Sequence, residues 1–383
     1  MKKILSLNKV VSKNKFLETK VPRIVVQKHK LDLLFLICVI LLSLFGLLMI
    51  YDASQFEAFQ SFNDKYYFAR QQSISFILGI IALIFFSLFN YHNLKKFANF
   101  FLFFSLLLLI LVFIPNLGIS AYGAHRWLKL GFITLQPAEI IKMAAIIFFA
   151  NLFSKQFKLA PFLILVGVVA IIVGILQKDL GSAIVFGVIS FGMYFIAGAP
   201  IKHFIAVVVA GLAAIVSLIL IAPYRIKRVL AFLDPFSDPQ GYSYHITQVL
   251  IALGSGGFTG LGIGQSRQKY SFIPEVTTDS IFSIIGEEFG FIGSTIVIIL
   301  FGILIYKGFK IAENCPDKFG KLLAVGLIIW IGAQTVVNLS AMVSLMPLTG
   351  VPLPFISFGG SALLVNLIAA GILLNISKQT TKQ

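Results

Sequence analysis

Four groups of polar and charged residues lie in or beside long apolar stretches of this 383-residue sequence. Ionisable side chains are costly in an apolar setting, so they mark places where chemistry or a built cavity is expected. The groups occupy residues 124–142, 177–182, 223–288 and 347–361. They are the candidate positions for a functional site.

The first group joins a basic stretch to the start of an apolar run. Arg126 and Lys129 precede Pro137, which suits the first turn of a helix. Glu139 and Lys142 are three residues apart on one face of that helix and can pair. Two interpretations stay open: a structural ion pair that lets a polar helix start enter lipid, or a charged cavity wall with Arg126 available to a phosphate.

The second and fourth groups read as turns at the ends of apolar runs. Asp179 lies in a very short turn, where it could cap the following helix or line a site. Residues 347–361 are rich in Pro, Gly and Ser. Irregular backbone at membrane depth is tolerated only where protein or a cavity covers it, so we expect a re-entrant or cavity-lining turn.

The third group opens with a basic triplet, Arg225, Lys227 and Arg228. The triplet could contact anionic lipid headgroups, or it could hold a pyrophosphate together with glycines that permit close backbone approach. Glu287 and Glu288 follow inside the next apolar run, and one of the two must face protein or water rather than lipid.

The composition identifies the elements that must position these groups. Hydrophobic residues make up 58% of the chain, charged residues 12%, and the mean hydropathy is +0.96. A soluble domain carries roughly 25% charged residues, so a soluble fold is excluded. Cys38 and Cys315 do not look like a disulfide pair. The chain shows no Walker loop, dinucleotide fingerprint or zinc-ligand spacing, which argues against an ATP-driven pump or a metalloprotease.

Apolar runs near the length of a membrane span recur along the chain. We therefore predict an all-α, polytopic membrane protein with about ten transmembrane helices, in one membrane domain over residues 31–377. The runs are 31–51, 73–90, 97–115, 138–154, 161–177, 181–199, 202–222, 280–306, 321–345 and 360–377.

The distribution of Lys and Arg predicts the orientation of these helices. With both termini in the cytoplasm, basic residues favour the cytoplasmic connections by about two to one. Residues 1–30, with eight Lys and one Arg, are then a cytoplasmic tail that we expect to be disordered. Residues 378–383 form a second cytoplasmic tail, and residues 223–279 form a large extracytoplasmic loop between the seventh and eighth spans. The net charge of +16 follows this pattern, which does not suit nucleic-acid binding.

The motifs within these groups resemble the SEDS proteins (shape, elongation, division and sporulation), the FtsW/RodA/SpoVE family of bacterial cell-wall enzymes. The resemblance covers roughly residues 31–377 and rests on six motifs in the same order. They are Arg126-Trp127 with Gln136-Pro137-x-Glu139-x-x-Lys142; Asp179-Leu180-Gly181; Arg228 with Phe232-Leu233-x-Pro235; Pro274-Glu275-x-x-Thr278-Asp279; Gly286-Glu287-Glu288-x-Gly290; and Pro352-x-Pro354-Phe355-x-Ser357-x-Gly359-Gly360-Ser361. The glycine-rich stretch from Gly260 to Lys269 looks more like the FtsW, or division, branch.

The resemblance implies a peptidoglycan glycosyltransferase that polymerises lipid II at the outer face of the bacterial cytoplasmic membrane, for the septal wall. Asp279 would be its catalytic acid–base residue. Two departures stand out: Thr277 occupies the position of a usual His, and Lys178 that of a usual Pro. The missing His removes a neighbour that the family pattern would place beside the Asp279 carboxyl.

The expected site extends well beyond this carboxylate. The candidates for binding substrate or pyrophosphate are Arg126, Lys129, Arg225, Arg228, Lys269, Glu275, Thr278 and Ser357. The candidates for structural or cavity roles are Trp127, Gln136, Glu139, Lys142, Asp179, Glu287, Glu288, Gly359, Gly360 and Ser361.

The resemblance also sets expectations for partners and cofactors. The ligands would be lipid II and the nascent glycan strand. The protein partners would be a class B penicillin-binding protein, which is a transpeptidase, and other membrane proteins of the divisome or elongasome. A divalent cation, Mg²⁺ or Mn²⁺, could assist the pyrophosphate, and no nucleotide is expected. Alternatives are a lipid II flippase and an elongation-type, RodA-like polymerase. A carrier would place its polar groups near the midplane, whereas here they gather at one face.

Overall fold

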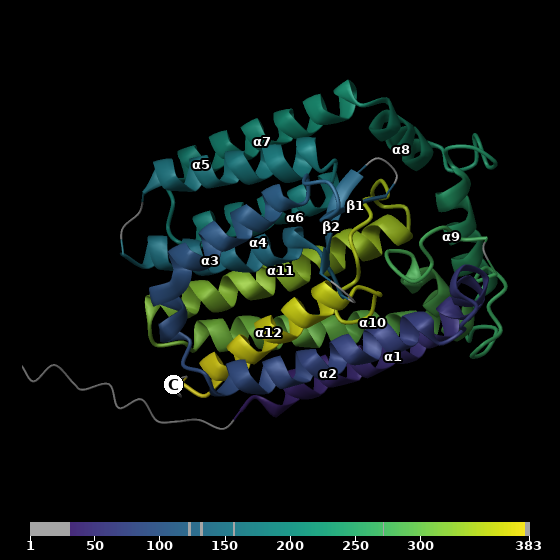
Figure 1. Ribbon diagram of the computed structural model, residues 1–383, viewed down its shortest axis with the longest axis horizontal. Coiled ribbons are helices and arrows are strands. Elements are labelled where there is room, and N and C mark those ends of the chain that lie inside the picture. Colours follow the sequence, from purple (N-terminus) through teal and green to yellow (C-terminus); the bar gives the residue numbers. More distant parts are fainter. Residues whose placement is uncertain (1–30, 122–123, 131–132, 156–157, 271, 380–383) are drawn as a thin grey trace, which may run out of the picture.

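The computed structural model describes residues 31–121, 124–130, 133–155, 158–270 and 272–379. The described chain is almost entirely helical (Figure 1). The basic tail predicted for residues 1–30 and the last four residues of the C-terminal tail lie outside the described residues.

The predicted spans are present as helices. The described residues contain nine helices long and apolar enough to cross a membrane, counting α5 with its π-helical continuation η1, and the shorter apolar helix α6 adds 17 residues. Together they correspond to the ten predicted runs. Their bounds are α1 Leu33–Phe62, α2 Tyr67–Leu88, α3 His92–Leu111, α4 Pro137–Lys155, α5 Leu159–Val169, η1 Ala170–Leu176, α6 Leu180–Ile196, α7 Ile201–Ile221, α10 Ile281–Glu313, α11 Lys318–Met342 and α12 Gly360–Ser377.

The segment predicted as one long loop, 223–279, is partly helical. It contains α8 (Pro223–Leu233) and α9 (Tyr244–Ser255). Pro223 begins α8, where its missing N–H leaves no hydrogen bond unmade. Helix α1 also continues to Phe62, well past the predicted end at residue 51. A helix can outlast its apolar run once its end leaves the lipid.

The predicted helical fold also contains a small sheet. The connection between α3 and α4 folds into antiparallel strands β1 (Gly118–Ala121), β2 (Ala124–Leu130) and β3 (Ile133–Leu135), in the order β1-β2-β3. Arg126, Trp127 and Lys129 all lie on the middle strand β2, where Trp127 faces Ile119 of β1 across the ladder.

Helices α11 and α12 form the centre of the bundle. In the most apolar 18-residue stretch of α11, 72% of the residues are buried inside the protein, and in that of α12, 83% are buried. In the corresponding stretch of α7, none is buried. Helix α12 packs on α2, and α11 packs on α10, α6 and α4. Helix α7 lies at an edge of the bundle (Figure 1).

The site-bearing connections share one end of this bundle. Because successive long helices run in opposite directions, the connections after α1, α3, η1, α7 and α11 meet at the same end. Helices α8 and α9 mark it in Figure 1, on the side away from the C-terminus. We call it the loop end.

Candidate active site

Asp279 lies at the loop end, two residues before α10 begins. It belongs to residues 272–280, a stretch built only of turns, which we call the catalytic segment. Its main-chain carbonyl accepts a hydrogen bond of 2.7 Å from Asn338 Nδ2 on α11, and the same amide nitrogen donates to Val351 O at 2.9 Å. One buried amide of α11 thus fixes the backbone of Asp279 against residues 347–359.

The side chain of Asp279 is enclosed on two sides. The Thr278 hydroxyl lies 3.3 Å from Asp279 Oδ1 and 3.0 Å from Glu275 Oε2, so it links the two carboxyl groups. On the other side, Gly350 (φ 73°) presents its backbone, and a Cβ placed there would lie 3.8 Å from Asp279 Oδ2. Asp279 is 7% exposed.

This enclosure makes the carboxylate a better base. Burial raises the pKa of Asp279 to about 6, while the positive charges of Arg228 and Arg126 and the hydrogen bond from Thr278 act in the opposite direction. A general base works best when its pKa lies near the working pH. Asp279 therefore combines ionisation at neutral pH with affinity for a proton.

Arg126 and Arg228 are the predicted phosphate ligands that act on Asp279. Arg126 Nη2 donates to Lys178 O at 2.7 Å, and Arg228 Nη1 donates to Leu348 O at 3.2 Å. Each contact uses one of the five N–H donors of a guanidinium group. Strand β2 and helix α8 thus bring two cations to one carboxylate.

The turn before α6 explains one departure from the family pattern. Lys178 has a φ of 54°, a conformation that proline cannot adopt, and its carbonyl accepts the hydrogen bond from Arg126. The capping interpretation of Asp179 is confirmed, since its Oδ1 accepts from Ser182 N at 3.0 Å.

Three other basic candidates have different surroundings. Arg225 is buried and donates to Leu218 O, Gly174 O and the Tyr224 hydroxyl, so it joins α8 to α7 and η1. Lys129 is exposed on β2. Lys269 is buried between carboxylates, and three carboxylate oxygens lie within 3.2 Å of its Nζ, which leaves no donor of that ammonium free for a phosphate.

Residues 347–359 form the predicted irregular turn, with most of its side chains from Val351 to Ser357 buried. Ser357 Oγ accepts from Leu353 N at 2.8 Å, inside the turn. Phe358 N donates to Thr277 O at 2.8 Å and ties the turn to the catalytic segment. Ser357 therefore supports this wall of the site.

The start of α12 is packed closely against its neighbours. Gly359 N donates to Gln72 Oε1 at 3.2 Å, and Ser361 Oγ accepts from Gln136 N at 3.1 Å. A Cβ on Gly360 would lie 2.6 Å from Ser75 Oγ, so glycine allows α12 to approach α2. The predicted structural group of Gln136, Gly359, Gly360 and Ser361 is thus a helix-packing joint.

The predicted pair of Glu139 and Lys142 is present and fully buried. Lys142 Nζ lies 2.6 Å from Glu139 Oε1, and the two side chains are 1% and 0% exposed. Gln334 of α11 donates to the same carboxylate at 3.4 Å, and Lys142 Nζ lies 5.5 Å from the centroid of the Trp330 ring. Gln334 and Asn338 are one turn apart on α11, so one face of that helix contacts both this pair and Asp279.

His245 is a site residue that the sequence did not reveal. Its Nε2 lies 2.7 Å from Ser280 Oγ, directly after Asp279. Burial, together with the positive charge of Arg228, lowers the pKa of His245 to about 4, so the ring is neutral at neutral pH. A histidine thus approaches the catalytic segment from α9, although Thr277 stands where the family has one.

The described residues hold no group of three or more His, Cys, Asp or Glu side chains placed to bind a metal ion.

The chain was compared with known protein families and structures. Residues 32–382 match the family FTSW_RODA_SPOVE, described as "Cell cycle protein". The chain is 40% identical to "Stage V sporulation protein E" of Bacillus subtilis, over 92% of this chain and 98% of that protein. It is 39% identical to "Probable peptidoglycan glycosyltransferase FtsW" of Geobacter metallireducens, over 91% of this chain and 95% of that protein.

Solved structures show the same fold. A chain of a peptidoglycan synthase complex, in a structure described as "Structural coordination of polymerization and crosslinking by a peptidoglycan synthase complex", matches with a TM-score of 0.73 and 27% identity, over 91% of this chain and 97% of that one. The rod shape determining protein RodA of Thermus thermophilus matches with a TM-score of 0.68 and 25% identity, over 92% and 98% of the two chains.

Proposed function

The chain belongs to the FtsW/RodA/SpoVE family, and we propose that it is a peptidoglycan glycosyltransferase that polymerises lipid II into glycan strands. The observation that carries the proposal is the enclosed carboxylate of Asp279, which lies at one end of a membrane bundle within the influence of two arginines. The names of its relatives support the same activity.

The proposed reaction transfers a growing glycan from a polyprenyl pyrophosphate donor to a sugar hydroxyl of lipid II. The carboxylate of Asp279 takes the hydroxyl proton as that oxygen attacks the anomeric carbon of the donor. The new glycosidic bond forms while the bond between that carbon and the pyrophosphate oxygen breaks, and the leaving pyrophosphate keeps the electron pair. Arg126 and Arg228 stabilise the charge that develops on it.

The loop end is proposed to face outward, so that the polymerase works at the extracytoplasmic surface of the cytoplasmic membrane. The excess of Lys and Arg on the opposite connections supports this orientation. The clustering of the catalytic segment, Arg126 and Arg228 at one end favours a surface reaction over the flippase alternative, because a carrier places its binding groups near the midplane.

The partner is proposed to be a class B penicillin-binding protein that crosslinks the new strands. The support is the similar chain from a peptidoglycan synthase complex whose description joins polymerization with crosslinking. A role in the septal wall, alongside other divisome proteins, is proposed from the FtsW relatives.

The direct test is polymerisation of lipid II by the purified protein, with and without the transpeptidase and with Mg²⁺, Mn²⁺ or EDTA. Glycan strands are the expected product. Movement of labelled lipid II between the leaflets of a vesicle, with no strand formed, would instead favour the flippase. Equal activity in EDTA would remove the proposed cation requirement and leave the polymerase proposal intact.

The pH dependence of the reaction gives a more specific test. Polymerisation is expected to fall on acidification with a midpoint near pH 6, where the pKa raised by burial places Asp279. Arg228 lowers that pKa, so Arg228→Gln should move the acid limb to higher pH and cut kcat/KM by about 100-fold. Lys227→Gln, an exposed neighbour on α8, is the matched control and should leave the limb in place. If the midpoint of the acid limb stays the same in Arg228→Gln, the proposed electrostatic effect of Arg228 on Asp279 is contradicted.

A further inference from the structure

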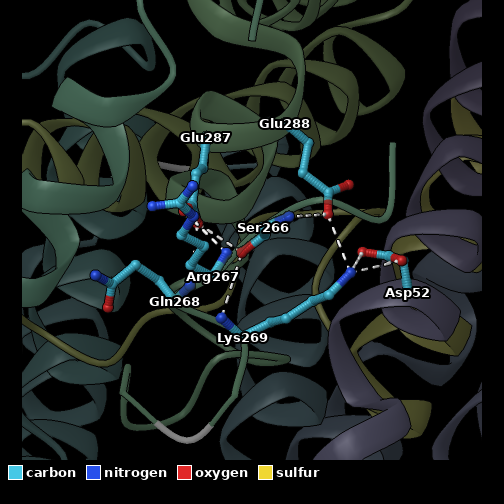
Figure 2. A network of polar contacts seen from close by, with 7 residues as sticks. All are labelled: Asp52, Ser266, Arg267, Gln268, Lys269, Glu287 and Glu288. Carbon is cyan, nitrogen blue, oxygen red and sulfur yellow. Dashed lines mark hydrogen bonds and ion pairs between the residues drawn. The ribbon is translucent and has the colours of Figure 1, made fainter. Parts of the chain in front are cut away.

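A buried polar network joins α1, α10 and the stretch of chain that leads into the catalytic segment (Figure 2). Its members are Asp52 of α1, Ser266 and Lys269 of the connection, and Glu287 and Glu288 of α10. We call this set the clamp. Ser266, Lys269 and Asp52 are 1%, 7% and 8% exposed, and both glutamates are 1% exposed.

The two glutamates accept hydrogen bonds from the backbone of the connection and from the Ser266 hydroxyl. Glu287 Oε1 accepts from Arg267 N at 3.0 Å, and Glu287 Oε2 accepts from the Ser266 hydroxyl at 2.5 Å. Glu288 Oε1 accepts from Ser266 N at 3.1 Å. Two successive residues of one helix therefore hold the same short stretch of chain.

The main chain of α10 is also opened to hold this connection. At Gly290 (φ 65°) the helix is kinked. The carbonyls of Glu287 and Glu288 accept instead from Leu261 N and Gly262 N, both at 3.0 Å. The amides of residues 291 and 292 donate to residues 257 and 258, at 2.9 and 3.1 Å. At the kink, main-chain groups of α10 therefore form hydrogen bonds to the connection in place of hydrogen bonds within the helix.

Lys269 is the only cation among the five residues of the clamp, and it connects the clamp to α1 through Asp52. Its Nζ lies 2.9 Å from both carboxylate oxygens of Asp52 and 3.2 Å from Glu288 Oε1. Burial acts to lower the pKa of Lys269, but the bonds to Asp52 and Glu288 outweigh it and raise that pKa. The ammonium therefore stays charged and offsets two buried carboxylates.

The clamp lies at both ends of the catalytic segment, which carries Asp279. Lys269 precedes the catalytic segment, and α10 begins at Ile281 directly after it. Glu287 and Glu288 lie in the first turns of the same α10, so the segment leaves the clamp and returns to the helix that forms it. Ile273 N donates to Gln268 O at 3.3 Å, which joins the segment to the clamped stretch. Since the segment contains no helix or strand, its position depends on how its ends are held as well as on the contacts from Asn338 and Phe358.

We propose that Lys269, through its ion pairs with Asp52 and Glu288, is a positioning residue that sets the place of the catalytic segment and hence of the Asp279 carboxylate. This inference rests on the proposed polymerase function. In this arrangement Lys269 does not touch the reacting atoms. The sequence predicted that it binds phosphate, whereas we propose that it affects catalysis by holding the catalytic segment in place.

The test compares Lys269→Met with Lys310→Met. Lys310 also pairs with a glutamate of α10, at 2.8 Å, but on the exposed surface near the other end of that helix. In Lys269→Met, kcat per folded enzyme should fall by about 100-fold, as expected for misplacement of a reacting group by about 1 Å, while KM for lipid II changes less than threefold. The acid limb of the pH profile should also move to lower pH, because contact with water removes part of the burial that raises the pKa of Asp279. Lys310→Met should match the wild type in each measurement.

Hydrogen exchange supplies a readout that needs no lipid II. Amides of residues 257–268 and 272–280 should exchange faster in Lys269→Met and at the wild-type rate in Lys310→Met. Unchanged exchange in both stretches, or wild-type kcat, would overturn the inference. If the wild type makes no glycan, the polymerase proposal fails while the exchange result still decides whether Lys269 holds the segment.

A cavity beside the clamp allows chemical rescue. Lys269 and Asp52 line a cavity of about 480 Å³, together with Gln55, Phe56 and Tyr270. Ethylammonium should therefore enter Lys269→Ala and restore activity in part, whereas ethanol should not. If neither lysine variant folds, Asp52→Asn is used instead, because it keeps Lys269 paired with Glu288. Its kcat should fall and its amide exchange should become faster, both by less than in the lysine variants. Wild-type behaviour of Asp52→Asn would then overturn the inference.

Discussion

Asp279→Asn is expected to abolish glycan synthesis while the protein remains folded in the membrane. Asparagine keeps the size of the side chain but cannot accept the proton of the attacking hydroxyl. Loss of general-base catalysis costs about 100-fold to 10,000-fold in rate. The contacts that fix the backbone of Asp279, above all the bond from Asn338 Nδ2, do not involve its carboxyl group and should persist.

The same substitution should leave stability unchanged or increase it at neutral pH. Burial raises the pKa of Asp279 to about 6, so the folded protein binds this proton more tightly than the unfolded chain does. Stability therefore falls as pH rises from about 4 to about 6, by up to about 3 kcal/mol from this group. Asparagine removes that cost. The variant should be inactive and at least as stable as the wild type at pH 7.5.

Both properties can be measured on one preparation, by glycan synthesis from lipid II and by thermal unfolding in detergent. Asp64→Asn is the matched control, because Asp64 lies at the same end of the bundle and pairs with the exposed Arg70. The control should polymerise at the wild-type rate. Synthesis by Asp279→Asn at close to the wild-type rate would refute the catalytic assignment, and so would a loss of activity fully explained by unfolding.

Lys142→Met is expected to destabilise the bundle by about 3–5 kcal/mol. Removing one member of a buried ion pair leaves its partner charged without compensation. Lys142 and Glu139 are at most 1% exposed. Among the described residues, the other hydrogen bond to the Glu139 carboxylate is a long one from Gln334, at 3.4 Å. The double variant Glu139→Gln/Lys142→Met should recover much of the loss, because no unpaired charge stays behind.

A double-mutant cycle in thermal unfolding measures this coupling. Lys155→Met, at the exposed end of the same helix α4, is the control and should shift Tm little. Independent, additive effects of the two buried substitutions would contradict the pairing. Polymerisation by the double variant then tests whether the pair also serves the site, since Gln334 and Asn338 share a face of α11.

The sequence was sufficient for the membrane-spanning helices because each signal is local, whereas the short helices α8 and α9 were predicted as loop. A run of about 20 apolar residues is recognised without knowledge of its neighbours. The Glu139–Lys142 pair and the Asp179 cap are local in the same sense, since each involves residues three apart. The catalytic carboxylate came from motif resemblance rather than from physical pattern, because nothing about spacing alone separates Asp279 from other acidic residues of the loops.

What was missed depends on contacts that no local pattern in the sequence encodes. Strands β1 to β3 are short, and their pairing rather than their composition defines them. His245 meets Ser280 across 35 positions, and Lys269 meets Asp52 across 217. No periodicity encodes such pairs. Lys269 therefore resembled a free cation in the sequence, although the fold surrounds it with carboxylates.

The separation between Asp52 and Lys269 has a consequence for biosynthesis. Asp52 of α1 is synthesised 217 residues before Lys269, the lysine with which it pairs. At about 5–20 residues per second, that interval is on the order of 10–40 s. During it, the eight α-helices from α2 to α9 are made, and Asp52 lacks the charge of Lys269. A nascent chain therefore completes the clamp only after the connection between α7 and α10 has been made.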